Sequence, residues 1–154
     1  REIREFWRGT LVLGGAISDG AGVRAAEILG ADFAYMGTRF IATRESLAQP
    51  DYKAMLTTAG AGDIVYTPAV SGTGANFLWP SLERAGYTRE ALAGASPPTH
   101  HDYGETAKAW RDVWSAGHGV ATIHDVPTVA DLAARLAREY RDACALPPSP
   151  ALRG

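Results

Sequence analysis

Residues 10–40 read TLVLGGAISDGAGVRAAEILGADFAYMGTRF, and this stretch decides the fold. Residues 10–13 form a short apolar run that predicts a strand, and residues 33–36 predict a second, buried strand. The glycine-rich loop and helical pattern between them make a βαβ unit, which pairs its strands in parallel through a right-handed crossover. The stretch therefore predicts an α/β fold.

The helix between the two strands carries signals at both ends. Asp19 is placed to cap it, because a carboxylate accepts the first free backbone N–H groups of a helix. Val23, Ala26 and Leu29 recur at helical spacing and form an apolar face. Gly30 is expected to end the helix in a left-handed conformation.

Bare glycines follow both predicted strands. Gly14, Gly15 and Gly20 lie in the first loop, and Gly37 follows the second strand. Residues 40–46 are expected to form a short helix after the second turn. A tight turn explains any single glycine, but two such loops on adjacent parallel strands favour a phosphate site. Backbone N–H groups approach an anion where no Cβ intervenes, and a helix N-terminus adds a favourable dipole. In (β/α)₈ barrels a phosphate site often lies in the loops after strands seven and eight.

Four motifs carry a resemblance to a known family. They are GGAISDG at 14–20, YMGTRF at 35–40, SGTGANFL at 71–78 and WSAGHGV at 114–120. Their order and spacing over about residues 4–142 resemble the carboxyl-terminal part of the nitronate monooxygenase family, once called 2-nitropropane dioxygenases. The resemblance implies the carboxyl-terminal part of an FMN-binding (β/α)₈ barrel (TIM barrel) with an added, mostly helical subdomain. The related flavin enoyl-acyl-carrier-protein reductases share much of the pattern.

The resemblance also implies which residues bind the cofactor. Backbone groups of both loops would hold the FMN phosphate, and the Thr38 hydroxyl would add a donor. Relatives often carry a second glycine where this chain has Ala16, whose methyl group leaves the N–H available. The implied cofactor-binding residues are Gly15, Ala16, Tyr35, Met36, Gly37 and Thr38.

Arg39 and His118 each have two possible interpretations. Arg39 is either a cation for the phosphate or one half of a salt bridge at the edge of the core. His118 either reaches the edge of the cofactor or is a turn histidine bonded to backbone. The sequence 100–102, His-His-Asp, is interpreted as a solvated loop, so no metal site is predicted. The family's catalytic histidine comes from an earlier glycine-rich loop that nothing here matches, so no catalytic residue is assigned.

Length limits what this chain can build alone. It has 154 residues, whereas a full eight-stranded barrel typically takes ~250. We therefore expect the carboxyl-terminal half of a longer protein. The predicted parts are the last two barrel strands with their phosphate loops at 1–45, the helical subdomain at 46–103, returning helices at 104–145 and a disordered tail at 146–154.

Composition narrows the class of protein. The net charge is −2 and the basic residues are scattered, which argues against nucleic acid as the main partner. No apolar run of about 18 residues is present, which argues against a membrane-spanning helix. The single Cys144 cannot form an internal disulfide, so a reducing, cytoplasmic location is expected.

Three functions remain open at this point. The first is an FMN-dependent oxidoreductase of the nitronate monooxygenase type, which would take a nitronate or nitroalkane as its small-molecule substrate and oxygen as co-substrate. The second is an FMN-dependent enoyl-thioester reductase that uses NADH. The third is a non-catalytic fragment or assembly partner, since an open two-stranded edge invites pairing in a homo-oligomer or with the amino-terminal half.

Overall fold

The computed structural model describes residues 1–93 and 112–147. Along the chain it contains α1 (Glu2–Phe6), β1 (Val12–Gly14), α2 (Gly20–Ile28), β2 (Phe33–Tyr35), α3 (Thr38–Ile41), α4 (Pro50–Thr58), η1 (Ala61–Asp63), β3 (Ile64–Thr67), β4 (Ala75–Leu78), α5 (Trp79–Arg84), α6 (Arg89–Leu92), η2 (His118–Thr122) and α8 (Val129–Ala145). The 100–102 loop and most of the predicted tail lie outside the described residues.

The predicted βαβ unit is confirmed. β1 and β2 pair in parallel, with Val12 opposite Phe33 and Gly14 opposite Tyr35, and α2 connects them. The Asp19 carboxylate accepts a hydrogen bond from the Gly22 N–H at 2.7 Å, as its capping role predicts. The fold is thus mixed helix and strand, and its first unit is the one that the sequence predicts.

The prediction that the second strand is buried is wrong. Phe33 is 63% exposed and Tyr35 is 68% exposed. Val12 and Leu13 of β1 are exposed as well. Parallel strands are normally covered on both faces, but within the described residues β1 and β2 pair only with each other.

The helix after the second glycine turn is shorter than the predicted 40–46. α3 begins at Thr38, with Gly37 as its N-cap, and ends at Ile41. The next residues make tertiary contacts instead of helical ones. The Arg44 N–H donates to the Pro127 carbonyl at 2.9 Å, and the Glu45 carboxylate accepts from the Val129 N–H at 2.9 Å.

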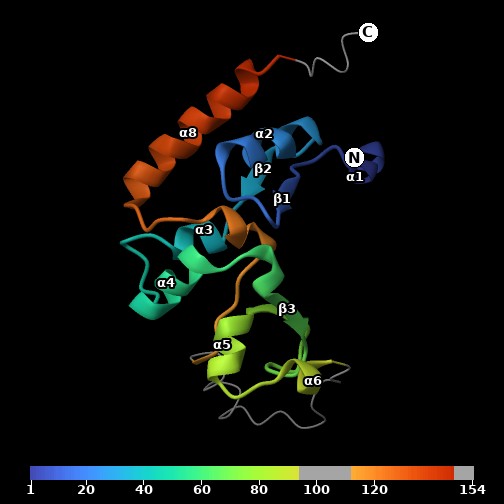
Figure 1. Cartoon of the computed structure of the whole chain (residues 1–154). Coiled ribbons are helices and arrows are strands. Elements are labelled where there is room, and N and C mark those ends of the chain that lie inside the picture. Colours follow the sequence, from blue (N-terminus) through green and yellow to red (C-terminus); the bar gives the residue numbers. More distant parts are fainter. Residues whose placement is uncertain (94–111, 148–154) are drawn as a thin grey trace.

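The two buried apolar clusters lie outside the βαβ unit. Figure 1 shows β1, β2, α2 and α8 toward one end of the molecule, with α3 and α4 between them and the region of β3, α5 and α6. One buried cluster joins α4, β4 and the segment 114–123, and a second fills the space around the antiparallel β3–β4 hairpin. The clusters contain Ala42, Leu56, Ala59, Leu78, Trp114, Ala116, Val120 and Ile123, and Val70, Phe77, Leu82, Leu92 and Val113.

The predicted subdomain at 46–103 contains α4, α5 and α6 together with the β3–β4 hairpin. The division of the chain into four parts stays a prediction. In the described residues no helix is long and apolar enough to cross a bilayer. The same residues hold no cluster of three His, Cys, Asp or Glu side chains suited to a metal ion.

Candidate functional site

The two glycine loops leave the sheet at the same edge. Gly14 and Tyr35, the last residues of β1 and β2, are register partners, so the loops that follow them start side by side. A Cβ built on Gly15 or on Gly37 would meet no atom within 4 Å. Open space therefore lies in front of both loops, as an approaching ligand requires.

The first loop has an unusual backbone. Gly15 has φ +106° and Ala16 has φ +55°, the only positive φ of a non-glycine residue in the described part of the chain. A left-handed conformation costs an L residue roughly 1–2 kcal/mol. Strain of this kind concentrates at functional sites, and it explains why a glycine would be accepted at the Ala16 position.

The second loop is joined to a third segment, the turn around His118, through a contact that the sequence did not predict. The Gly117 N–H donates a hydrogen bond to Thr38 Oγ1 at 2.9 Å. A hydroxyl has one hydrogen and two acceptor lone pairs. Thr38 therefore accepts from Gly117, and its own hydroxyl hydrogen remains available to donate.

The same third segment packs on the first loop. A Cβ on Gly119 would clash with Ser18 Oγ and would lie 3.0 Å from the Ala16 carbonyl carbon. Only glycine allows this approach. The Gly-His-Gly turn at 117–119 is visible in the sequence. Its neighbouring residues do not indicate that it packs on Ala16 and Ser18, about a hundred positions earlier.

His118, between those two glycines, is the first residue of η2 and is exposed. Its imidazole makes no hydrogen bond with any described residue, so the interpretation as a turn histidine bonded to backbone is not supported. Contact between His118 and a cofactor stays a prediction.

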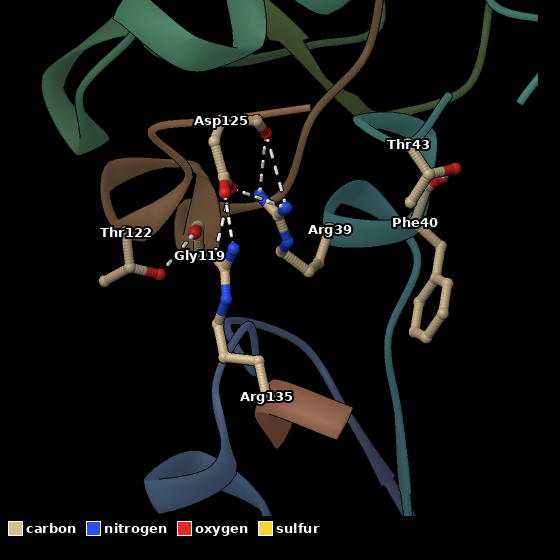
Figure 2. Close-up of polar contacts among 7 residues, drawn as sticks. All are labelled: Arg39, Phe40, Thr43, Gly119, Thr122, Asp125 and Arg135. Carbon is tan, nitrogen blue, oxygen red and sulfur yellow. Dashed lines mark hydrogen bonds and ion pairs between the residues drawn. The ribbon is translucent and has the colours of Figure 1, made fainter. Parts of the chain in front are cut away.

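Arg39 forms an ion pair with Asp125 instead of facing the loops. Its side chain is almost fully buried on α3, and Nη2 donates to Asp125 Oδ1 at 2.9 Å (Figure 2). Both terminal nitrogens also lie 3.3 Å from the Asp125 carbonyl oxygen, which accepts from them. Of the two interpretations of Arg39, the structure supports the salt bridge at the edge of the core.

Asp125 is shared with a second arginine. Arg135 of α8 donates to Oδ1 at 3.1 Å and to Oδ2 at 2.5 Å, a two-pronged contact. The Arg135 guanidinium, and next to it that of Arg39, hold the pKa of Asp125 below its ordinary value, against the opposing effect of burial. Burial lowers the pKa of Arg39, whose guanidinium nevertheless stays charged at neutral pH. The cluster thus carries two cations around one carboxylate.

The first N–H groups of α2 are bonded to protein carboxylates, one of them the predicted Asp19 cap. The Asp19 carboxylate binds the Gly22 N–H, and the Glu139 carboxylate of α8 accepts from the Gly20 N–H at 2.9 Å. Two protein carboxylates therefore already accept from N–H groups of this helix end. The candidate site rests on the loop amides and the Thr38 hydroxyl.

The six residues implied as cofactor-binding share one edge of the molecule. They follow or end β1 and β2, and each is exposed or half-buried. Gly15 and Ala16 lie in the first loop, and Gly37 and Thr38 lie in the second. Tyr35 ends β2 and Met36 follows it. Their role as ligands of a flavin stays a prediction.

Comparison with known proteins points to one family. The family model described as nitronate monooxygenase matches residues 11–139. A nitronate monooxygenase of Paraburkholderia phytofirmans is 32% identical over 140 residues, and one of Pseudomonas aeruginosa is 32% identical over 154. These alignments cover 85% and 87% of this chain but only 38% and 41% of the relatives, so the chain spans about two fifths of their length.

Solved structures agree on the fold. A nitroalkane oxidase from Streptomyces ansochromogenes matches with a TM-score of 0.74 and 27% identity, covering 93% of this chain and 42% of that one. FabK from Thermotoga maritima matches with a TM-score of 0.70 and 24% identity, covering 93% of this chain and 48% of that one. These neighbours are TIM-barrel proteins.

The family match covers most of the chain and includes both glycine loops, the bridging Gly-His-Gly turn and most of α8. Enzymes of this family are flavin-dependent oxidoreductases. The chain belongs to the nitronate monooxygenase family.

Proposed function

We propose that this chain carries the FMN phosphate cradle of an oxidoreductase that oxidises alkyl nitronates with oxygen. The observation that supports it best is the pair of glycine loops at one strand edge, with open space in front of Gly15 and Gly37. When bound, the flavin supplies the redox chemistry, and the protein supplies binding and orientation.

The residues present fit a phosphate. The N–H groups of Gly15, Ala16 and Gly37 are donors on exposed backbone, and Thr38 keeps a hydroxyl hydrogen to donate. Each hydrogen bond to a charged group contributes about 1.5–3 kcal/mol, so the loss of one should weaken phosphate binding about tenfold or more. In this arrangement backbone groups of Tyr35 and Met36 would flank the flavin ring.

We also propose that further strands complete the barrel. Apolar side chains of β1, β2 and α2 are exposed, among them Val12, Phe33 and Ile28. Exposed apolar strands and unpaired edges favour association. The relatives are more than twice as long as the matched region. In this proposal the chain is the carboxyl-terminal part of the barrel. A base that removes the α-proton of a nitroalkane would come from the part that completes the barrel.

The experiment that tests the cradle compares FMN with riboflavin, which lacks the phosphate. Fluorescence titration of the 154-residue chain with each should show FMN bound at least tenfold more tightly, the effect of about one charge-assisted hydrogen bond. Equal affinities would show that the loops do not recognise phosphate.

Substrate class needs a second measurement, on the protein that contains the completed barrel with bound FMN. Under anaerobic conditions we expect an alkyl nitronate to bleach the flavin absorption and NADH to leave it unchanged. Rapid bleaching by NADH would instead favour the enoyl-thioester reductase. Bleaching by neither would favour a non-catalytic protein.

A further inference from the structure

Residues 117–125, here called the bridging segment, are attached to α3 at both ends. At the first end, the Gly117 N–H donates to Thr38 Oγ1 at 2.9 Å. At the second end, Arg39 donates to the side chain and the carbonyl oxygen of Asp125. Because Thr38 and Arg39 are consecutive residues, one short helix fixes both ends of the segment.

Near its start, at Gly119, the bridging segment lies on the other glycine loop. Gly119 approaches Ala16 and Ser18 so closely that a Cβ would not fit. The segment thus touches the first loop at Gly119 and the second loop at Gly117. A shift of the segment would change the surroundings of both loops at once.

Asp125 is the contact of the second end with α3. Both terminal nitrogens of the buried Arg39 bond to this one residue, and the Arg39 Nε has no hydrogen-bond partner among the described residues. Arg135 ties the same carboxylate to α8 (Figure 2). Without the carboxylate, two guanidinium groups would face each other, with Glu139 as a further negative charge acting on both.

We infer that Asp125 is a positioning residue for the anion site, acting through Arg39 and the bridging segment on the Thr38 hydroxyl. The inference rests on the proposed phosphate cradle. Thr38 Oγ1 accepts from Gly117, so its hydrogen is directed away from that amide and toward a ligand. When the segment is released, Thr38 loses this partner and its hydroxyl is no longer held for a phosphate.

The test uses Asp125→Asn, which keeps the shape of the side chain and removes its charge. Since removal of a charge that pairs buried Arg39 can unfold a protein, Arg135→Lys is the milder second variant, because lysine keeps the charge but loses the two-pronged geometry. Asp51→Asn is the matched control: Asp51 is exposed on α4, and its ion-pair partner, Arg84 at 4.0 Å, lies outside this cluster. Circular dichroism selects the variants that keep the fold.

Two readouts are measured on each folded variant. The first is hydrogen exchange of the Gly117 amide, which needs no ligand. We expect it to accelerate about tenfold or more in Asp125→Asn, less in Arg135→Lys and not in Asp51→Asn, since local opening sets the exchange rate. The second is the ratio of FMN to riboflavin affinity, which we expect to fall about tenfold in Asp125→Asn, the effect of one lost charge-assisted hydrogen bond.

Each result decides a separate point. Unchanged Gly117 exchange in both variants would overturn the positioning role, whatever the chain binds. Faster exchange with an unchanged affinity ratio would overturn the link between Asp125 and the anion site. If the unaltered chain binds FMN and riboflavin equally, the proposed function fails, and the exchange measurement still decides whether Asp125 holds the bridging segment.

Discussion

Gly37 offers the cleanest single-residue test of the cradle. Its φ of −102° is allowed for any L residue, and a Cβ there meets no atom within 4 Å. The Gly37→Val variant should therefore fold normally while its side chain fills the space in front of the second loop. We expect FMN affinity to fall about tenfold or more, because at least one phosphate contact worth about 1.5–3 kcal/mol is lost.

The matched control is Gly62→Val. A Cβ on Gly62, in η1, also meets no atom within 4 Å, and η1 lies outside both glycine loops. Urea unfolding and FMN titration of the two variants should give similar stabilities and different affinities. Equal FMN affinity for Gly37→Val and the unaltered chain would remove Gly37 from the site.

Asp125 should also leave a signature in the pH dependence of stability. The guanidinium of Arg135, and then that of Arg39, lower its folded-state pKa below the ordinary value of 3.8. A carboxylate with a lowered pKa stabilises the folded state above its unfolded pKa, and this contribution is lost as pH falls through the folded value.

We therefore expect the unaltered chain to exceed Asp125→Asn in free energy of unfolding by a constant amount at all pH values above about 5, where the unfolded carboxyl is also ionised. The difference should shrink as pH falls below 3.8. Urea titrations at a series of pH values measure it, with Asp51→Asn as the control for loss of one negative charge. A difference that stays constant down to the lowest pH would contradict the ion-pair assignment.

At the scale of elements, the sequence predicted the βαβ unit because neighbouring residues determine its strands, helix cap and helix end. The Asp19 cap, the left-handed Gly30 and the apolar strands each act within a few residues. α3 was mispredicted because Arg44 and Glu45 bond to residues 127 and 129 instead of continuing the helix. That competition between helical and tertiary hydrogen bonds cannot be seen in a single sequence.

The candidate site also has a part that the sequence predicted and a part that it did not. The two glycine loops could be predicted, since each follows a strand with the same direction. The bridging segment could not, because Gly117 and Asp125 meet α3 across 79 and 86 residues of sequence. The interpretation of Arg39 stayed open for the same reason, because its partner Asp125 is 86 residues away in the sequence.

The contact between α2 and α8 gives a prediction at this scale. A Cβ on Gly20 would clash with the Tyr140 nitrogen and lie 2.6 Å from Glu139 Cβ, so the two helices approach each other only over a glycine. We expect Gly20→Ala to destabilise the chain by about 1–3 kcal/mol through overpacking. Gly62→Ala, where the added methyl group meets nothing, is the control in urea unfolding. Equal stability of the two variants would show that α8 does not pack on α2 as described.

At the scale of the whole molecule, the apolar surface lies in an unusual place. The buried clusters surround α4, β4 and the β3–β4 hairpin, whereas the strands that lead to the candidate site are exposed. The apolar residues can be read directly from the sequence, but the sequence did not predict which of them are buried. The exposed strands of the βαβ unit are the surface against which, in our proposal, the rest of the barrel packs.

The most direct test of the central claim is a visible absorption spectrum of the chain after mixing with FMN and gel filtration, with the elution volume recorded. We predict that a flavin spectrum elutes with the protein. We further expect the volume of an assembly larger than a 16.3 kDa monomer, because exposed strand edges pair. A protein peak without flavin absorption would contradict the claim that the loops at Gly15 and Gly37 form a phosphate cradle in this chain.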